Sequence, residues 1–100
     1  MPSRKPAPPV GQDVTLLRMK IIVQARAKYD IRGIAAVDIL APHCATALFI
    51  LTRGAMVVRI NGEWSEATYC ATQPEGHRAF EASRALMRHH GAVKLRHLND

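Results

Sequence analysis

The chain has 100 residues, a formal net charge of +6, 48% hydrophobic residues and 22% charged residues. These values fit one domain with a modest core and exclude a chain that is disordered throughout. The positive charge favours acidic partners, nucleic acid first and an anionic membrane surface second, and no apolar run is long enough to span a bilayer.

Residues 1–12 form a proline-rich segment that also carries Arg4 and Lys5. Almost none of its side chains can pack, so we expect a flexible or polyproline-like arm that either has no role or contacts DNA. The segment lacks the apolar stretch of a secretory signal. We therefore expect a cytoplasmic protein, with one domain over residues 13–98.

Residues 13–29 contain no glycine or proline and are rich in good helix formers. Met19 and Val23 have the spacing of a buried helix face, whereas Leu17 and Ile21 fall on another side. The pattern predicts a helix that contacts its own core on one side and a second partner, such as another subunit, on the other.

Two further helices are expected, over residues 31–40 and 43–53. Asp30 can cap the first, and Pro42 separates it from the second, because proline cannot continue a helix. Gly54 provides a stop. The apolar run in the second segment could equally form a buried strand, but its alanines and leucines favour helix.

The next segment predicts a β-hairpin. Residues 56–60 and 63–70 contain strand formers, and Asn61-Gly62 between them is a strong signal for a two-residue turn. This register places Arg59 opposite Trp64, where the guanidinium can stack on the indole.

A final amphipathic helix is expected to begin at the capping box of residues 72–75 and to end at Gly91. Residues 92–98 alternate in polarity and predict a short edge strand. The first and last helices are expected to carry a homodimer interface, through residues 13–29 and 73–90.

This order of elements resembles the winged helix-turn-helix family. The matching segments are residues 34–37 of the second helix, the turn at residues 41–42, Leu48 and Leu51 of the third helix, residues 54–57 before the wing and residues 61–64 at its tip. The resemblance covers roughly residues 13–90. It implies an α+β winged helix with a three-helix core, a hairpin wing and a C-terminal amphipathic helix, and a small DNA-binding transcriptional regulator as function.

In that family the third helix enters the major groove of duplex DNA and the wing contacts the backbone or the minor groove. The resemblance therefore implies a DNA-binding set drawn from the third helix, the wing and the arm. Its members are His43, Thr46, Arg53, Arg59, Asn61, Arg4 and Lys5.

The expected third helix offers only one threonine to base edges, and the three basic and three acidic side chains of residues 31–72 cancel. The alternative function is a protein-interaction module, an inhibitor or adaptor of phage or plasmid type, that does not bind DNA.

Catalysis, a cofactor and a metal are not expected. His77 and His90 are too far apart on one helix to share an ion, and the neighbouring His43 and Cys44 do not face each other. Cys44 and Cys70 are expected to be reduced core thiols.

Overall fold

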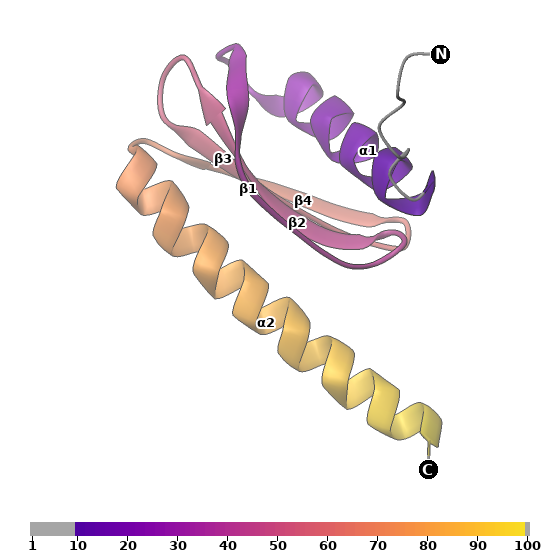
Figure 1. Cartoon of the computed structure of the whole chain (residues 1–100). Coiled ribbons are helices and arrows are strands. Elements are labelled where there is room, and N and C mark those ends of the chain that lie inside the picture. Colours follow the sequence, from indigo (N-terminus) through magenta and orange to yellow (C-terminus); the bar gives the residue numbers. More distant parts are fainter. Residues whose placement is uncertain (1–9, 100) are drawn as a thin grey trace, which may run out of the picture.

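A computed structural model describes residues 10–99, and the side chains of residues 14–89. Its elements, in chain order, are α1 (Val10–Arg26), β1 (Ile31–Ala41), β2 (Cys44–Leu51), β3 (Ala55–Asn61), β4 (Trp64–Cys70) and α2 (Gln73–Asn99). The strands form one antiparallel sheet in the order β1-β2-β3-β4. Helix α1 covers one face of this sheet and α2 covers the other, and the C-terminal part of α2 extends past the sheet (Figure 1). The winged-helix prediction is therefore wrong, because a two-helix, four-stranded architecture replaces the three-helix core.

The helix predicted for residues 31–40 is strand β1. Its apolar residues Ile31, Ile34 and Val37 recur every third position, as they do in an amphipathic helix. The register of β1 against β2 shifts between Ile31 and Gly33 and again between Ile34 and Ala36. Each shift adds a residue to the strand, so side chains three positions apart reach the same face. The bulged strand therefore imitates the spacing of a helix.

The helix predicted for residues 43–53 is strand β2, the alternative that the apolar run left open. Its odd-numbered residues, such as Phe49, pack in the core beneath α1, and its even-numbered residues, such as Leu48, pack beneath α2. A central strand covered on both faces is apolar throughout, which removes the alternation that identifies a half-buried strand.

The predicted hairpin is confirmed as β3 and β4, with a corrected turn. Gly62 and Glu63 form the turn, and Asn61 pairs with Trp64 as the last residue of β3. Arg59 therefore pairs with Glu66 and reaches Trp64 diagonally, with its guanidinium carbon 5.5 Å from the ring centroid.

Both terminal helices exist, but their ends differ from the prediction. Helix α1 begins at Val10, inside the expected arm, and ends at Arg26, while residues 1–9 lie outside the described residues. At the start of α2 the backbone N–H of Glu75 donates to Thr72 Oγ1 at 3.3 Å, as a cap requires. Helix α2 continues through Gly91, so the predicted stop and the edge strand over residues 92–98 are wrong. One glycine costs a helix only about 1 kcal/mol relative to alanine.

Each face of the sheet has its own core. Beneath α1, Met19 and Val23 pack on side chains of β2 and β3 that include Phe49 and Val58. Beneath α2, Phe80 packs on side chains that include Leu48. The two cores share the backbones of β2 and β3, which places both helices firmly relative to the strands.

Candidate functional site

Helix α1 has one buried stripe and one exposed apolar stripe. Thr15, Met19 and Val23 are buried against the sheet. Val14, Leu17 and Ile21 point elsewhere and keep 48%, 58% and 54% of their surface exposed. They recur at intervals of three and four residues, so they form one line along the helix. The second apolar side expected for this helix is therefore present and is not covered by the chain's own described residues.

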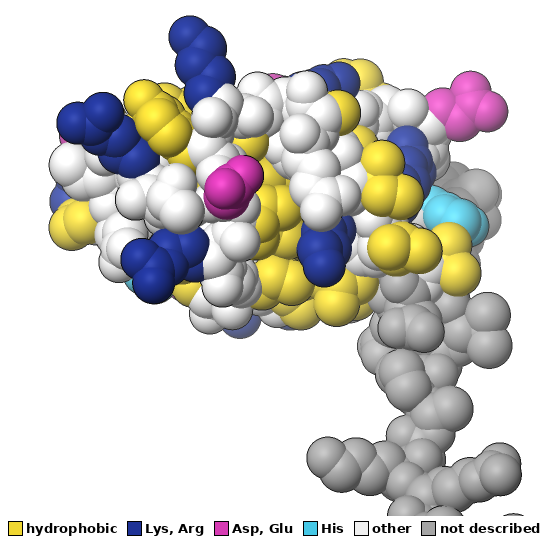
Figure 2. All heavy atoms as spheres, turned by 90° about the horizontal axis from the view of Figure 1, so that it is seen from above, with side chains coloured by type: hydrophobic (Ala, Val, Ile, Leu, Met, Phe, Trp, Pro, Cys, Tyr) yellow, Lys and Arg dark blue, Asp and Glu magenta, His cyan; other side chains and the backbone are white. Residues whose placement is uncertain are grey.

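The edge strand β1 adds two exposed apolar side chains to the same face. Ile34 pairs with Phe49 and Val37 pairs with Ala47, which places both on the side of the sheet that carries α1. Ile34 and Val37 are 42% and 43% exposed. On this side of the molecule, hydrophobic side chains lie among Lys and Arg side chains (Figure 2). We call the five residues Val14, Leu17, Ile21, Ile34 and Val37 the α1–β1 apolar surface.

A groove runs beside this surface, between α1 and β1. A depression of about 250 Å³ is lined by Leu16, Leu17, Lys20 and Ile34. Lys20 and Ile34 also line a larger depression of about 710 Å³, which continues to the connection between α1 and β1 and includes Phe49 in its lining. The shared residues make the two depressions one groove, with aliphatic walls at one end and polar walls at the other.

The polar end of the groove is basic. Lys20, Lys28 and Arg32 line it, and Asp30 is the carboxylate among its lining residues. Among the ion pairs of the described residues, none involves Lys20, Lys28 or Arg32. Three cations against one carboxylate leave an excess of two positive charges facing the groove.

Aromatic contacts hold the connection between α1 and β1 in place at the basic end of the groove. The Tyr29 ring lies 6.0 Å from the Tyr69 ring, and the Arg53 guanidinium carbon lies 6.0 Å from the Tyr29 centroid. The Tyr69 hydroxyl donates to the Arg53 carbonyl at 3.2 Å. These contacts join β4, the β2–β3 turn and the segment after α1, so the basic end of the groove is built on a defined backbone.

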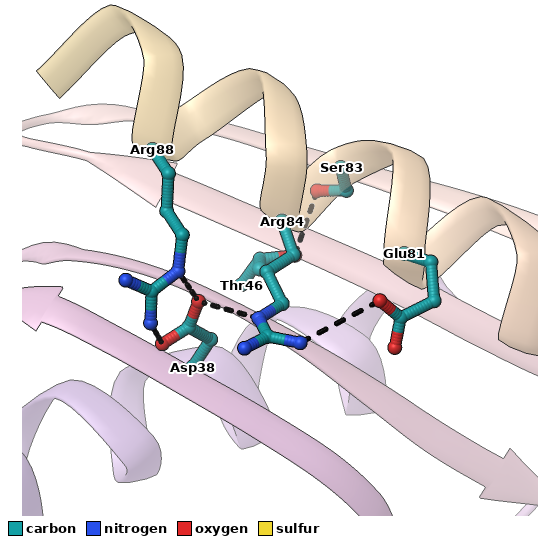
Figure 3. A network of polar contacts seen from close by, with 6 residues as sticks. All are labelled: Asp38, Thr46, Glu81, Ser83, Arg84 and Arg88. Atoms are coloured by element: carbon teal, nitrogen blue, oxygen red, sulfur yellow. Dashed lines mark hydrogen bonds and ion pairs between the residues drawn. The ribbon is translucent and has the colours of Figure 1, made fainter. Parts of the chain in front are cut away.

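The opposite face of the sheet carries a polar network that ties β1 to α2 (Figure 3). Asp38, whose side chain is 12% exposed, accepts from Arg88 at 2.8 and 2.9 Å and from Arg84 Nε at 3.2 Å. Arg84 also lies 3.6 Å from Glu81. Charge-assisted bonds of this kind fix the orientation of a helix on a strand. The carboxylate is fully engaged, so we assign this network a structural role.

A second buried contact joins α2 to β2 in the same view (Figure 3). The Thr46 hydroxyl donates to the Val58 carbonyl at 3.0 Å and lies 2.8 Å from Ser83 Oγ. A hydroxyl has one proton, and the carbonyl can only accept, so Ser83 donates to Thr46. Thr46 is fully buried, and the prediction that it lies exposed at the start of a reading helix is wrong.

The other residues of the predicted DNA-binding set are scattered. Exposed His43 and Asn61 lie at the end of the sheet that holds the β1–β2 and β3–β4 turns, and Arg53 lies in the β2–β3 turn at the other end. Arg59 is paired with Glu66 at 2.6 Å. Arg4 and Lys5 lie outside the described residues. The structure does not gather the described members of this set on one surface.

The two cysteines are free thiols, as predicted, but only Cys70 is buried and Cys44 is half-buried. Cys44 opens β2 beside Asn61, and Cys70 closes β4 beside Ala55, so they lie at opposite ends of the sheet. Burial raises the pKa of the Cys70 thiol, and the negative charge of Glu75 raises it further. Both effects keep this thiol protonated and unreactive near neutral pH.

The sequence identified only half of the α1–β1 site. Leu17 and Ile21 stood out because they fall off the core stripe of α1. Arg32, Ile34 and Val37 were assigned to a helix, so their position beside α1 was missed. The signal that was present is the density of β-branched residues in β1, which favours strand over helix.

Comparison with protein-family models, curated proteins and solved structures finds no match to this chain. None of the described helices has the length and apolar character needed to cross a membrane.

Proposed function

We propose that this protein is an interaction module that docks a partner protein on the α1–β1 apolar surface. The observation that carries the proposal is the cluster of five large aliphatic side chains, each at least 42% exposed, on two neighbouring elements. Single exposed aliphatic residues are common, but a cluster on one face beside a groove is typical of a site that a partner covers.

Of the two functions expected from the sequence, this is the alternative one. DNA binding was expected through a reading helix, and strand β2 occupies that segment with Ala45, Ala47 and Phe49 buried. The α1–β1 surface instead offers aliphatic contact area, which stabilises a complex in proportion to the apolar surface removed from water. We assign the protein a binding role and no catalytic step.

Site-specific photocross-linking tests the proposal. We expect a benzophenone amino acid in place of Leu17 to form a covalent adduct with one partner, identified by mass spectrometry, in cells that produce the protein. The matched control carries the same group in place of Arg78, an exposed residue of α2 on the other side of the sheet. An adduct of equal yield from both positions contradicts the proposal.

The identified partner then allows a binding measurement with purified proteins. Leu17→Asp is expected to weaken the complex by more than about tenfold, because burial of a leucine side chain contributes about 1.5–3 kcal/mol. Its helix content should not change, since Leu17 is 58% exposed. Unchanged affinity in a folded Leu17→Asp variant contradicts the assignment of the α1–β1 apolar surface as the docking site.

A further inference from the structure

We propose that the segment docked in the groove between α1 and β1 is an acidic, amphipathic helix of the partner protein. This inference rests on the proposed function and specifies the chemistry of the partner. It follows from the charge of the groove, from its aliphatic walls and from the irregular edge of β1.

The charge of the groove selects an acidic occupant. Lys20, Lys28 and Arg32 line it with one carboxylate, Asp30. On the opposite face of the sheet, Arg59, Arg84 and Arg88 instead form ion pairs with carboxylates of the chain. The cations of the groove are therefore available to form ion pairs with carboxylates of a partner.

The aliphatic walls select a polypeptide over a nucleic acid. Leu16, Leu17 and Ile34 border the same groove, and Lys20 lies between these walls and the basic end. A phosphodiester backbone would satisfy the cations and leave the aliphatic walls without an apolar partner. A segment that carries both leucine-like and acidic side chains satisfies both ends of the groove.

The edge of β1 selects a helix over an added strand. Strand addition needs a regular row of unpaired backbone groups, and β1 is interrupted by three register shifts. Bulges at a sheet edge oppose pairing with a further strand. The partner therefore uses side chains, with aliphatic residues at helical spacing on Leu17 and Ile34 and carboxylates toward Lys28 and Arg32.

A second copy of this chain fits the groove poorly. A two-fold contact brings the same patch of both copies together. Such a contact sets the excess positive charge of one groove against that of the other. The predicted homodimer interface at residues 13–29 and 73–90 is also divided by the fold, because α1 and α2 lie on opposite faces of the sheet (Figure 1).

Fluorescence anisotropy with designed peptides tests the inference. The probe is a labelled peptide of about five helical turns with leucines along one face and glutamates beside them. The comparison peptide replaces every glutamate with lysine. We expect the full chain to bind the glutamate peptide at least about tenfold more tightly than the lysine peptide, with affinity that falls as salt rises.

Charge reversal of the protein sharpens the test. Lys20→Glu combined with Arg32→Glu should lower affinity for the glutamate peptide by at least about tenfold and raise affinity for the lysine peptide. Arg78→Glu, which reverses an exposed cation outside the groove, is the matched control and should change neither. Equal binding of both peptides, or an equal effect of Arg78→Glu, overturns the inference.

Three further outcomes separate this inference from the proposed function. In the first, Leu17→Asp abolishes binding of the partner identified by cross-linking, and the charge reversals do not change its affinity. This outcome refutes the acidic helix and leaves the docking surface intact. Salt-sensitive binding of duplex DNA that Lys20→Glu with Arg32→Glu abolishes, without peptide binding, refutes both. A concentration-dependent dimer in sedimentation equilibrium that Leu17→Asp dissociates identifies a second copy as the occupant and also refutes the acidic helix.

Discussion

Gly54, in the turn between β2 and β3, has a φ of +75°, which an L side chain rarely adopts. A Cβ at this position would lie 2.3 Å from the carbonyl oxygen of Cys70 and 2.6 Å from the Tyr69 hydroxyl. The close approach brings the turn against the end of β4, whose Tyr69 ring packs on Tyr29 beside the groove. This glycine therefore supports the basic end of the site as well as the turn.

Gly54→Ala is expected to lower the free energy of unfolding by about 3 kcal/mol or more, because backbone strain and a clash with backbone atoms add. Gly62→Ala is the matched control: its φ is +63°, but nothing lies within 4 Å of its Cβ position. It should cost only the strain, about 1 kcal/mol. Urea unfolding followed by circular dichroism measures both. Equal losses show that the contact with β4 contributes nothing.

At the scale of an element, one buried hydroxyl pair is among the contacts that hold α2 on the sheet. Thr46 of β2 donates to the Val58 carbonyl and accepts from Ser83 of α2. Both side chains are buried, so removing the Thr46 hydroxyl leaves the Ser83 hydroxyl without this acceptor and without water, whereas Thr46 keeps the Val58 carbonyl as its acceptor when Ser83 is changed.

Thr46→Val is expected to destabilise the protein by about 1–3 kcal/mol, because it leaves the buried Ser83 hydroxyl without its hydrogen-bond acceptor. Adding Ser83→Ala removes that hydroxyl, so the double variant should lose less stability than the sum of the two single changes. A double-mutant cycle from urea midpoints measures the coupling, expected at about 1 kcal/mol. Strict additivity means that the two hydroxyls do not act as a pair.

The elements also show what the sequence could and could not predict. The hairpin, the cap at Thr72 and the first helix were predictable, because turn residues, caps and helical spacing act locally. Strands β1 and β2 were not. The bulges in β1 depend on pairing with β2, and the apolar character of β2 depends on helices that cover both its faces. Both are tertiary effects, which local patterns do not report.

The same distinction holds for the candidate site. Exposed Leu17 and Ile21 follow from the spacing within one helix. Their continuation into Ile34, Val37 and Arg32 depends on α1 lying across the sheet next to β1, which only the fold reveals. A binding surface made by two elements is thus predictable from sequence only to the extent that one element carries it.

For the molecule as a whole, the side chains of β2 and β3 point alternately to α1 and to α2, so these strands join the two cores. Val57 faces α2 and Val58 faces α1, and the same holds for Leu48 and Phe49. If either helix detached, it would expose one face of β2 and β3, whose other face is covered by the second helix. Stability is therefore shared between the cores, and the groove between α1 and β1 relies on packing beneath α2.

This sharing predicts one cooperative unfolding transition. Met19→Ala, in the core beneath α1, should cost about 2–5 kcal/mol, and Phe80→Ala, in the core beneath α2, about 3–5 kcal/mol. Each should lower the urea midpoint of the whole protein, so that helix content and the fluorescence of Trp64, the chain's single tryptophan, change together. Leu17→Ala is the control and should stay within about 0.5 kcal/mol, because Leu17 is exposed. Separate transitions for the two probes in either core variant would show that α1 and α2 fold on the sheet independently.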